Sequence, residues 1–153
     1  MIYIAHRGNT NGKFESYENE PNYIDKAIDD GYDVEIDIWY KDNIWWLGHD
    51  KPQYGIKFDW IQKRTHKLWV HCKNIEALEY LTTNKDGADI NFFWHETDVA
   101  TLTSFGYIWA YPGKQPIKQS IAVMPELNND VVIQCMGICS DYVKKYKDES
   151  TQA

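Results

Sequence analysis

The sequence is poor in cysteine and contains no long apolar stretch. Its three cysteines, Cys72, Cys135 and Cys139, are odd in number and form no CxxC pair. No segment resembles a secretion signal or a membrane span. We therefore expect a protein of the reducing cytoplasm, in which carboxylates rather than thiolates would hold any metal ion.

Basic residues are also scarce, since 16 Lys and Arg oppose 23 Asp and Glu, for a net charge of −7. A nucleic-acid surface needs a basic stripe to replace the counterions of the phosphate backbone. We therefore expect no nucleic-acid partner and no stable membrane association. A small molecule is the expected partner, and the sequence leaves the oligomeric state open.

What the sequence does contain is a rich supply of large aromatic residues. They make up 15% of the 153 residues and include 7 Trp and 11 Tyr. A chain of this length is sufficient for one domain with a core of its own. We predict a single domain over residues 1–145 and a polar C-terminal tail over 146–153.

Short apolar runs, rich in β-branched and aromatic residues, recur along the chain and predict buried strands. They cover residues 2–5, 33–39, 44–48, 67–73, 90–95, 107–111, 121–124 and 137–140. Helical periodicity is present at 20–30 and at 74–83, where Asn74 is a candidate N-cap, and residues 97–106 could supply one or two helical turns. This alternation predicts an α/β fold, specifically a compact (β/α) TIM-type barrel with several helices shortened or lost.

Polar residues collect where these predicted strands end. Glu35 and Asp37 are two residues apart on one strand, so their side chains share a face. Two carboxylates that close repel each other unless a proton or a cation lies between them. A divalent ion such as Mg²⁺ or Ca²⁺ would relieve this repulsion, whereas a solvent-facing pair on an edge strand is the alternative.

Basic and imidazole side chains occupy other strand ends. His6 and His49 have the ordinary pKa range that suits general acid–base chemistry at neutral pH. Arg7 could hold phosphate oxygens through its guanidinium fork, and Lys73 could add a positive charge. Trp94 and Trp109 lie close to strand ends, where they could form the floor of a substrate pocket or belong to the core.

Four short motifs occur in a specific order: "HRG" at 6–8, the pair "EN" at 18–19, "GYDVEID" at 31–37 and "GHD" at 48–50. Together they resemble the glycerophosphodiester phosphodiesterases, a family of the phosphatidylinositol-phospholipase-C-like superfamily of barrels. The remainder of the chain is less similar, although "GICSDYV" at 137–143 resembles the last strand of that family. The chain would be a short, compact branch of it.

The resemblance implies metal-dependent hydrolysis of a small, glycerophosphodiester-like substrate. His6 and His49 would be the catalytic acid and base, and Arg7, Lys73, Trp94 and Trp109 would contact the substrate. Glu35 and Asp37 would bind the metal together with His71, which stands where the family has a glutamate. Mg²⁺ or Ca²⁺ is favoured, imidazole would also admit Mn²⁺ or Zn²⁺, and Glu126 is a candidate replacement for the missing carboxylate.

Two other functions remain compatible with the same residues. The first is a barrel that binds a phosphorylated ligand but turns it over weakly or not at all, because the third carboxylate has been lost. The second is a phospholipase- or lyase-type activity on a lipid diester, which the acidic charge and the lack of a secretion signal disfavour.

Overall fold

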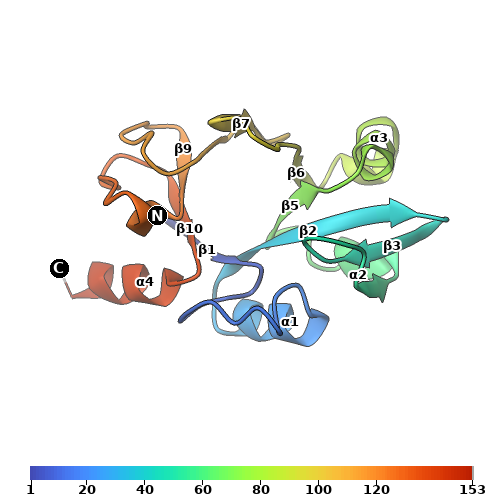
Figure 1. Cartoon of the computed structure of the whole chain (residues 1–153), viewed down its shortest axis with the longest axis horizontal. Helices are drawn as coiled ribbons and strands as arrows, with labels where there is room; N and C mark the ends of the chain where they lie inside the picture. Colours follow the sequence, from blue (N-terminus) through green and yellow to red (C-terminus); the bar gives the residue numbers. More distant parts are fainter. Residues whose placement is uncertain (153) are drawn as a thin grey trace.

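The computed structural model describes residues 1–152 and shows a ten-stranded mixed sheet that curls into a half-barrel. Figure 1 shows the strands curving around a central region, with the helices on the outside. Neighbouring parallel strands follow the order β6–β5–β2–β1–β10–β9–β8. Their bounds are Ile2–His6 (β1), Asp33–Lys41 (β2), Leu68–Cys72 (β5), Asn91–Phe93 (β6), Ile108–Ala110 (β8), Ser120–Val123 (β9) and Gly137–Ser140 (β10).

The remaining three strands are antiparallel to their neighbours. The C-terminal half of β2 pairs with β3 (Ile44–Leu47), which pairs with β4 (Tyr54–Ile56), and these strands form an arm beside the half-barrel. β7 (Ala100–Leu102) pairs with β8 at the other end of the sheet. All eight predicted strand segments are therefore strands, whereas β4 was not predicted and β7 occupies the segment expected to supply helical turns.

The prediction of a reduced TIM-type α/β barrel is wrong. Such a barrel requires a covering helix after nearly every strand and a sheet that closes on itself. Here the connections from β8 to β9 and from β9 to β10 contain no α-helix, only the 3₁₀ turn η2 (Pro125–Leu127). Within residues 1–152, β6 pairs with β5 and with no other strand, so the sheet does not close there. Phe92 of β6 forms two hydrogen bonds with Ser104, which lies in the loop after β7. The spacers are too short to provide the missing helices.

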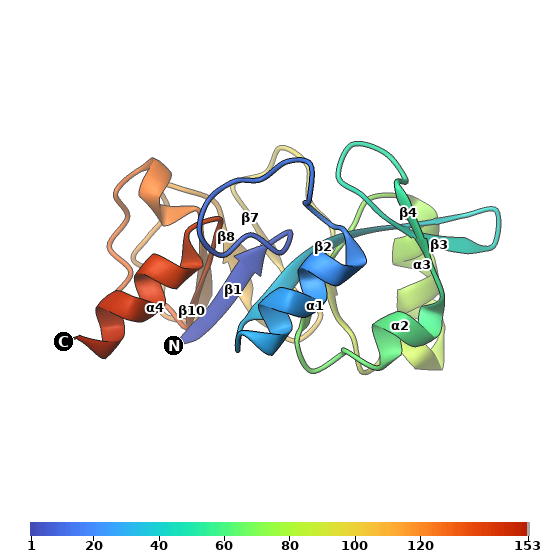
Figure 2. The ribbon, with the colours of Figure 1, turned by 90° about the horizontal axis from the view of Figure 1, so that it is seen from below.

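Four short helices cover part of the outer face. The two predicted helices are confirmed as α1 (Pro21–Asp29) and α3 (Ile75–Thr83), and the Asn74 side chain caps α3 by accepting from the Ala77 N–H. α2 (Phe58–Gln62) and α4 (Val143–Thr151) were not predicted, and most of the segment expected to be a polar tail lies in α4. A 3₁₀ turn, η1 (Lys85–Gly87), follows α3. Figure 2 shows α4 and α1 side by side on the outer face of the sheet.

The sheet separates the two larger of the three apolar clusters within residues 1–152. The outer cluster lies between strands and helices and includes Val34, Ile36 and Ile38 of β2. The inner cluster fills the concave side with large rings such as Trp69, Phe93 and Trp109. Because Glu35 and Asp37 alternate with the outer residues of β2, both carboxylates are directed to the concave side, where they are almost fully buried. In the described part of the chain, no helix has the length and apolar character required to cross a membrane.

Candidate active site

A cavity of about 480 Å³ opens where the parallel strands end on the concave side, above the inner aromatic cluster. Seven of the nine predicted site residues line it: His6, Arg7, Glu35, His49, His71, Lys73 and Trp109. Asp37 lies directly behind this lining and contacts both Arg7 and His71. Trp94 lies outside the cavity and packs against the outer apolar cluster. The structure therefore brings together eight of the nine residues.

His6 is held in one orientation by residues from the far end of the sequence. Its Nδ1 lies 2.8 Å from a carboxylate oxygen of Asp141, which also accepts a hydrogen bond from the Asn9 amide at 2.9 Å. Burial lowers the pKa of His6, but the Asp141 hydrogen bond and the charge of Glu35 outweigh it and raise this pKa overall. In the neutral ring, Nδ1 donates its proton to Asp141, and the lone pair of Nε2 accepts no hydrogen bond, with Glu35 Oε2 3.8 Å away.

For the diester hydrolysis expected from the sequence, we predict that Asp141→Asn lowers kcat about 10- to 100-fold with little change in KM. The substitution weakens the hydrogen bond from His6 and removes the charge of Asp141, both of which raise the pKa of His6, so the limb of the pH–rate profile governed by His6 shifts to lower pH. Rates measured between pH 5 and 9 would detect this shift. A uniform loss of rate without any shift would show that Asp141 has only a structural role.

The "HRG" turn positions Arg7 through an unusual backbone. Arg7 has φ +55° and Gly8 has φ +91°, and a Cβ at Gly8 would approach the Tyr23 ring to 2.7 Å. This turn directs the Arg7 guanidinium at two carboxylates, with Nη1 3.1 Å from Glu18 and Nε 3.3 Å from Asp37. Burial lowers the pKa of Arg7, but the surrounding carboxylates raise it overall, so the guanidinium stays charged.

The carboxylates of Glu35 and Asp37 differ sharply in environment. Two hydrogen bonds of 2.9 Å link Asp37 to Asn19, one from the Asn19 amide to Oδ2 and one from the Asp37 N–H to Oδ1 of Asn19. Burial would raise the pKa of Asp37, but His71, Arg7 and Asn19 lower it overall. Burial and the charge of Asp37 raise the pKa of Glu35 to about 7.

Two oxygens of this carboxylate pair have no hydrogen-bond partner. Glu35 Oε2 and Asp37 Oδ1 are both buried and accept no hydrogen bond, and the nearest groups that can carry a positive charge are His6 Nε2 at 3.8 Å from Glu35 and His71 Nδ1 at 3.1 Å from Asp37. One possible ligand atom from each of Glu35, Asp37 and His71 lies within 4.8 Å of the others. Unpaired buried carboxylate oxygens carry a large desolvation cost, which a bound cation would offset. The donor set of these three residues therefore fits a divalent metal ion.

His49 reaches the cavity from the β3–β4 arm rather than from a parallel strand. Because β3 runs antiparallel to β2, its C-terminal end returns to the level of Asp37. Gly48 makes the turn with φ +151°, where a Cβ would clash with the Lys51 carbonyl at 2.1 Å. The His49 Nδ1 lies 2.7 Å from Asp50 on the exposed side. Partial burial and the positive charge of Arg7 lower the pKa of His49.

Three supporting residues were not assigned a role from the sequence. Asn9 bridges Glu18 and Asp141, Asn19 holds Asp37, and Asp141 orients His6. Asn19 lies in the "EN" motif and Asp141 in "GICSDYV". Their partners are distant in sequence, so only the fold reveals these contacts. Glu126 does not replace the missing carboxylate, because its two oxygens accept from Ser140 and Tyr146.

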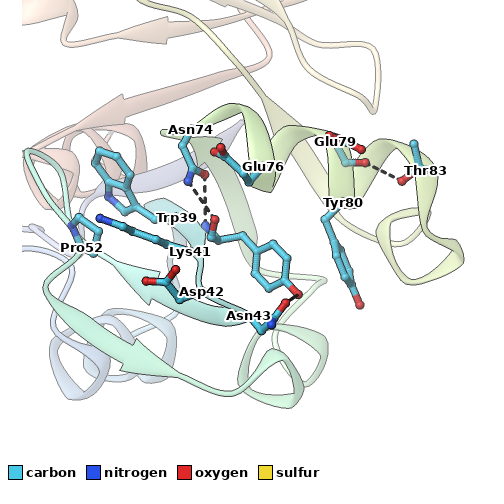
Figure 3. A pocket seen from close by; sticks show the side chains of 11 residues that line it. Trp39, Lys41, Asp42, Asn43, Pro52, Asn74, Glu76, Glu79, Tyr80 and Thr83 are labelled. Carbon is cyan, nitrogen blue, oxygen red and sulfur yellow. Dashed lines mark hydrogen bonds between the residues drawn. The ribbon is translucent and has the colours of Figure 1, made fainter.

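A second, larger cavity of about 750 Å³ lies between the β2–β3 hairpin and α3 (Figure 3). Figure 3 shows mostly surface side chains around it, including Lys41, Glu76 and Glu79, and no histidine. The Asn74 side-chain amide donates a hydrogen bond to the Tyr40 carbonyl and accepts one from the Tyr40 N–H, so it is not available to a ligand. This cavity lacks the converging acid–base and cationic groups that distinguish the first one.

Comparisons with protein-family models, with curated proteins and with solved structures found no match for this chain. The function must therefore be inferred from the residues of the cavity itself.

Proposed function

We propose that the protein hydrolyses a small phosphodiester, such as a glycerophosphodiester, with the help of a divalent metal ion. The observation that carries the proposal is that four histidines, an arginine, a lysine and a buried carboxylate pair converge at one cavity. The motif resemblance to the glycerophosphodiester phosphodiesterases supports the same activity.

Each group has a distinct task in this proposal. Arg7 and Lys73 provide positive charge for the phosphate oxygens, and Arg7 is fixed for this task by Glu18 and Asp37. His6 and His49 divide the roles of general base and general acid at the attacking and leaving oxygens. A divalent ion held by Glu35, Asp37 and His71 would supply further positive charge to the phosphate.

The test is a diester assay on the purified protein. Glycerophosphocholine, glycerophosphoethanolamine and bis(p-nitrophenyl) phosphate would be offered with EDTA and, separately, with individual divalent ions. We expect turnover that EDTA abolishes and that a divalent ion restores. If protein with a folded circular-dichroism spectrum turns over none of the three with any ion, the proposal is wrong.

A second candidate is a protein that binds a phosphorylated ligand without hydrolysing it. The presence of His71 where the related family has a carboxylate favours this reading, because fewer negative ligands would hold a catalytic ion less tightly. Calorimetry with glycerophosphocholine distinguishes the two candidates. Binding without turnover supports the second.

A further inference from the structure

The orientation of the His71 ring determines which of its nitrogens carries a proton. Its Nε2 lies 3.2 Å from the backbone carbonyl oxygen of His95. A carbonyl oxygen can only accept a hydrogen bond, so Nε2 must be the protonated nitrogen. The ring is also stacked on that of His95, with centroids 4.4 Å apart and planes 8° apart. In the neutral ring, Nδ1 therefore presents a lone pair in a fixed direction.

That lone pair faces another electron-pair donor. His71 Nδ1 lies 3.1 Å from Asp37 Oδ1, one of the buried oxygens without a hydrogen bond. The other such oxygen, on Glu35, belongs to the same cluster of possible ligands. All three side chains are more than nine-tenths buried. A nitrogen lone pair and carboxylate oxygens that face one another in the protein interior repel each other unless a cation or a proton lies between them.

The chemistry of the three donors favours one class of cation. Mg²⁺ and Ca²⁺ prefer oxygen ligands alone, whereas first-row transition ions readily accept imidazole nitrogen beside carboxylates. A ligating histidine typically donates its other N–H to a carbonyl or carboxylate, as His71 does. The 3.1 Å between Nδ1 and Oδ1 lies between the roughly 3.0 Å of octahedral and the roughly 3.4 Å of tetrahedral ligands at about 2.1 Å, so it fits a small divalent ion of either geometry.

We propose that Glu35, Asp37 and His71 form a site selective for a first-row transition-metal ion such as Mn²⁺ or Zn²⁺ over Mg²⁺ and Ca²⁺. The inference rests on the proposed function, because it names the ion of the same site. The alternative to a bound metal ion is a second proton on the His71 ring. With both nitrogens protonated, the imidazolium would form an ion pair with Asp37, and no metal ion would be required.

The experiment compares ion binding by the metal-free wild type with that by three single variants. His71→Glu restores a third carboxylate, and His71→Gln removes the imidazole lone pair. His66→Gln changes an exposed histidine that does not line the cavity and serves as the matched control. Mn²⁺ binding would be measured by electron paramagnetic resonance, and Mg²⁺, Ca²⁺ and Zn²⁺ binding by competition and by thermal melting.

We expect wild type and His66→Gln to bind Mn²⁺ at least about 10-fold more tightly than Mg²⁺. This preference should fall at least about 10-fold in His71→Glu, and His71→Gln should lose Mn²⁺ and Zn²⁺ affinity by a similar factor. In ¹⁵N spectra, Zn²⁺ should shift the His71 Nδ1 signal and leave Nε2 protonated.

Equal affinity for Mn²⁺ and Mg²⁺, unchanged selectivity in His71→Glu, or no ion binding at all would overturn the inference. Because none of these measurements uses turnover, they separate the two proposals. Tight Mn²⁺ binding without hydrolysis of any diester would contradict the proposed function and leave the metal site standing. Absence of ion binding in the resonance and melting experiments, together with hydrolysis that EDTA does not slow, would refute the metal site while leaving diester hydrolysis intact.

Discussion

His6→Ala is expected to lower kcat for diester hydrolysis about 10³-fold while changing KM less than about threefold. His6 is one of four histidines that line the cavity, and the buried carboxylate of Asp141 holds its Nδ1, so that Nε2 faces the cavity with Glu35 Oε2 at 3.8 Å. Proton transfer by a positioned side chain contributes about 10² to 10⁴ in rate. Steady-state kinetics with glycerophosphocholine or bis(p-nitrophenyl) phosphate would measure the loss.

The control for this prediction is His66→Ala, which removes an exposed histidine outside the cavity and should leave both constants unchanged. The fold should survive in the His6 variant, because Asp141 keeps its hydrogen bond from Asn9 and the cavity leaves room around the truncated side chain. Circular dichroism would verify this. A His6→Ala variant with wild-type kcat would show that the proposed mechanism is wrong.

Glu35→Gln is expected to change stability and activity in opposite directions. The metal-free protein should become more stable by about 1–2 kcal/mol at pH 8, because the change removes a buried charge that accepts no hydrogen bond at Oε2 and lies close to Asp37. The same change removes a negative ligand, so ion binding and metal-dependent turnover should fall at least about 100-fold. Thermal melts with EDTA and with Mn²⁺, together with kinetics, would measure both effects.

The stability gain should depend on pH in a defined way. The pKa of Glu35 is raised from its ordinary 4.5 to about 7, so the folded protein holds a proton in this interval that the unfolded chain has released. The contribution of the protonated Glu35 to the free energy of unfolding is fully present below pH 4.5 and is lost as the pH rises through about 7. The advantage of Gln should therefore be largest at pH 8 and close to zero at pH 4.5.

Glu96→Gln is the matched control, since Glu96 lines the same cavity but is exposed to solvent. It should leave the melting temperature and the response to ions unchanged. A Glu35→Gln variant that is less stable than wild type at pH 8 without metal would contradict the prediction. It would show that Glu35 is stabilised by His6 and Arg7 more than it is destabilised by burial.

The local patterns of the sequence were sufficient to predict much of the secondary structure and of the site. Apolar runs of β-branched and aromatic residues predicted eight of the ten strands, and helical periodicity with a capping residue predicted α1 and α3. The spacing of Glu35 and Asp37 correctly placed both carboxylates on one face, because alternation along a strand is a local property. The strand-end positions of His6, Arg7, His71 and Lys73 were equally informative.

The pairing of the strands could not be predicted from these patterns. Apolar runs do not reveal whether a strand pairs in parallel or antiparallel fashion, so the arm formed by β3 and β4 was not distinguished from the half-barrel strands. Whether the sheet closes depends on its total curvature and on helices that the short spacers cannot form. That is why a TIM-type barrel was predicted and an open half-barrel is found.

The sequence by itself determined which groups are available for chemistry, and the tertiary structure decided which of them act together. Asp141 lies 135 residues from His6 and yet orients its ring. Trp94 directly follows β6 but packs outside the cavity, and the two carboxylate oxygens of Glu126 accept hydrogen bonds from Ser140 and Tyr146. The protonated nitrogen of the neutral His71 ring follows from one carbonyl oxygen, that of His95, and the proposed preference among metal ions rests on it. Contacts of this kind depend on distances between residues remote in sequence, which only the folded chain fixes.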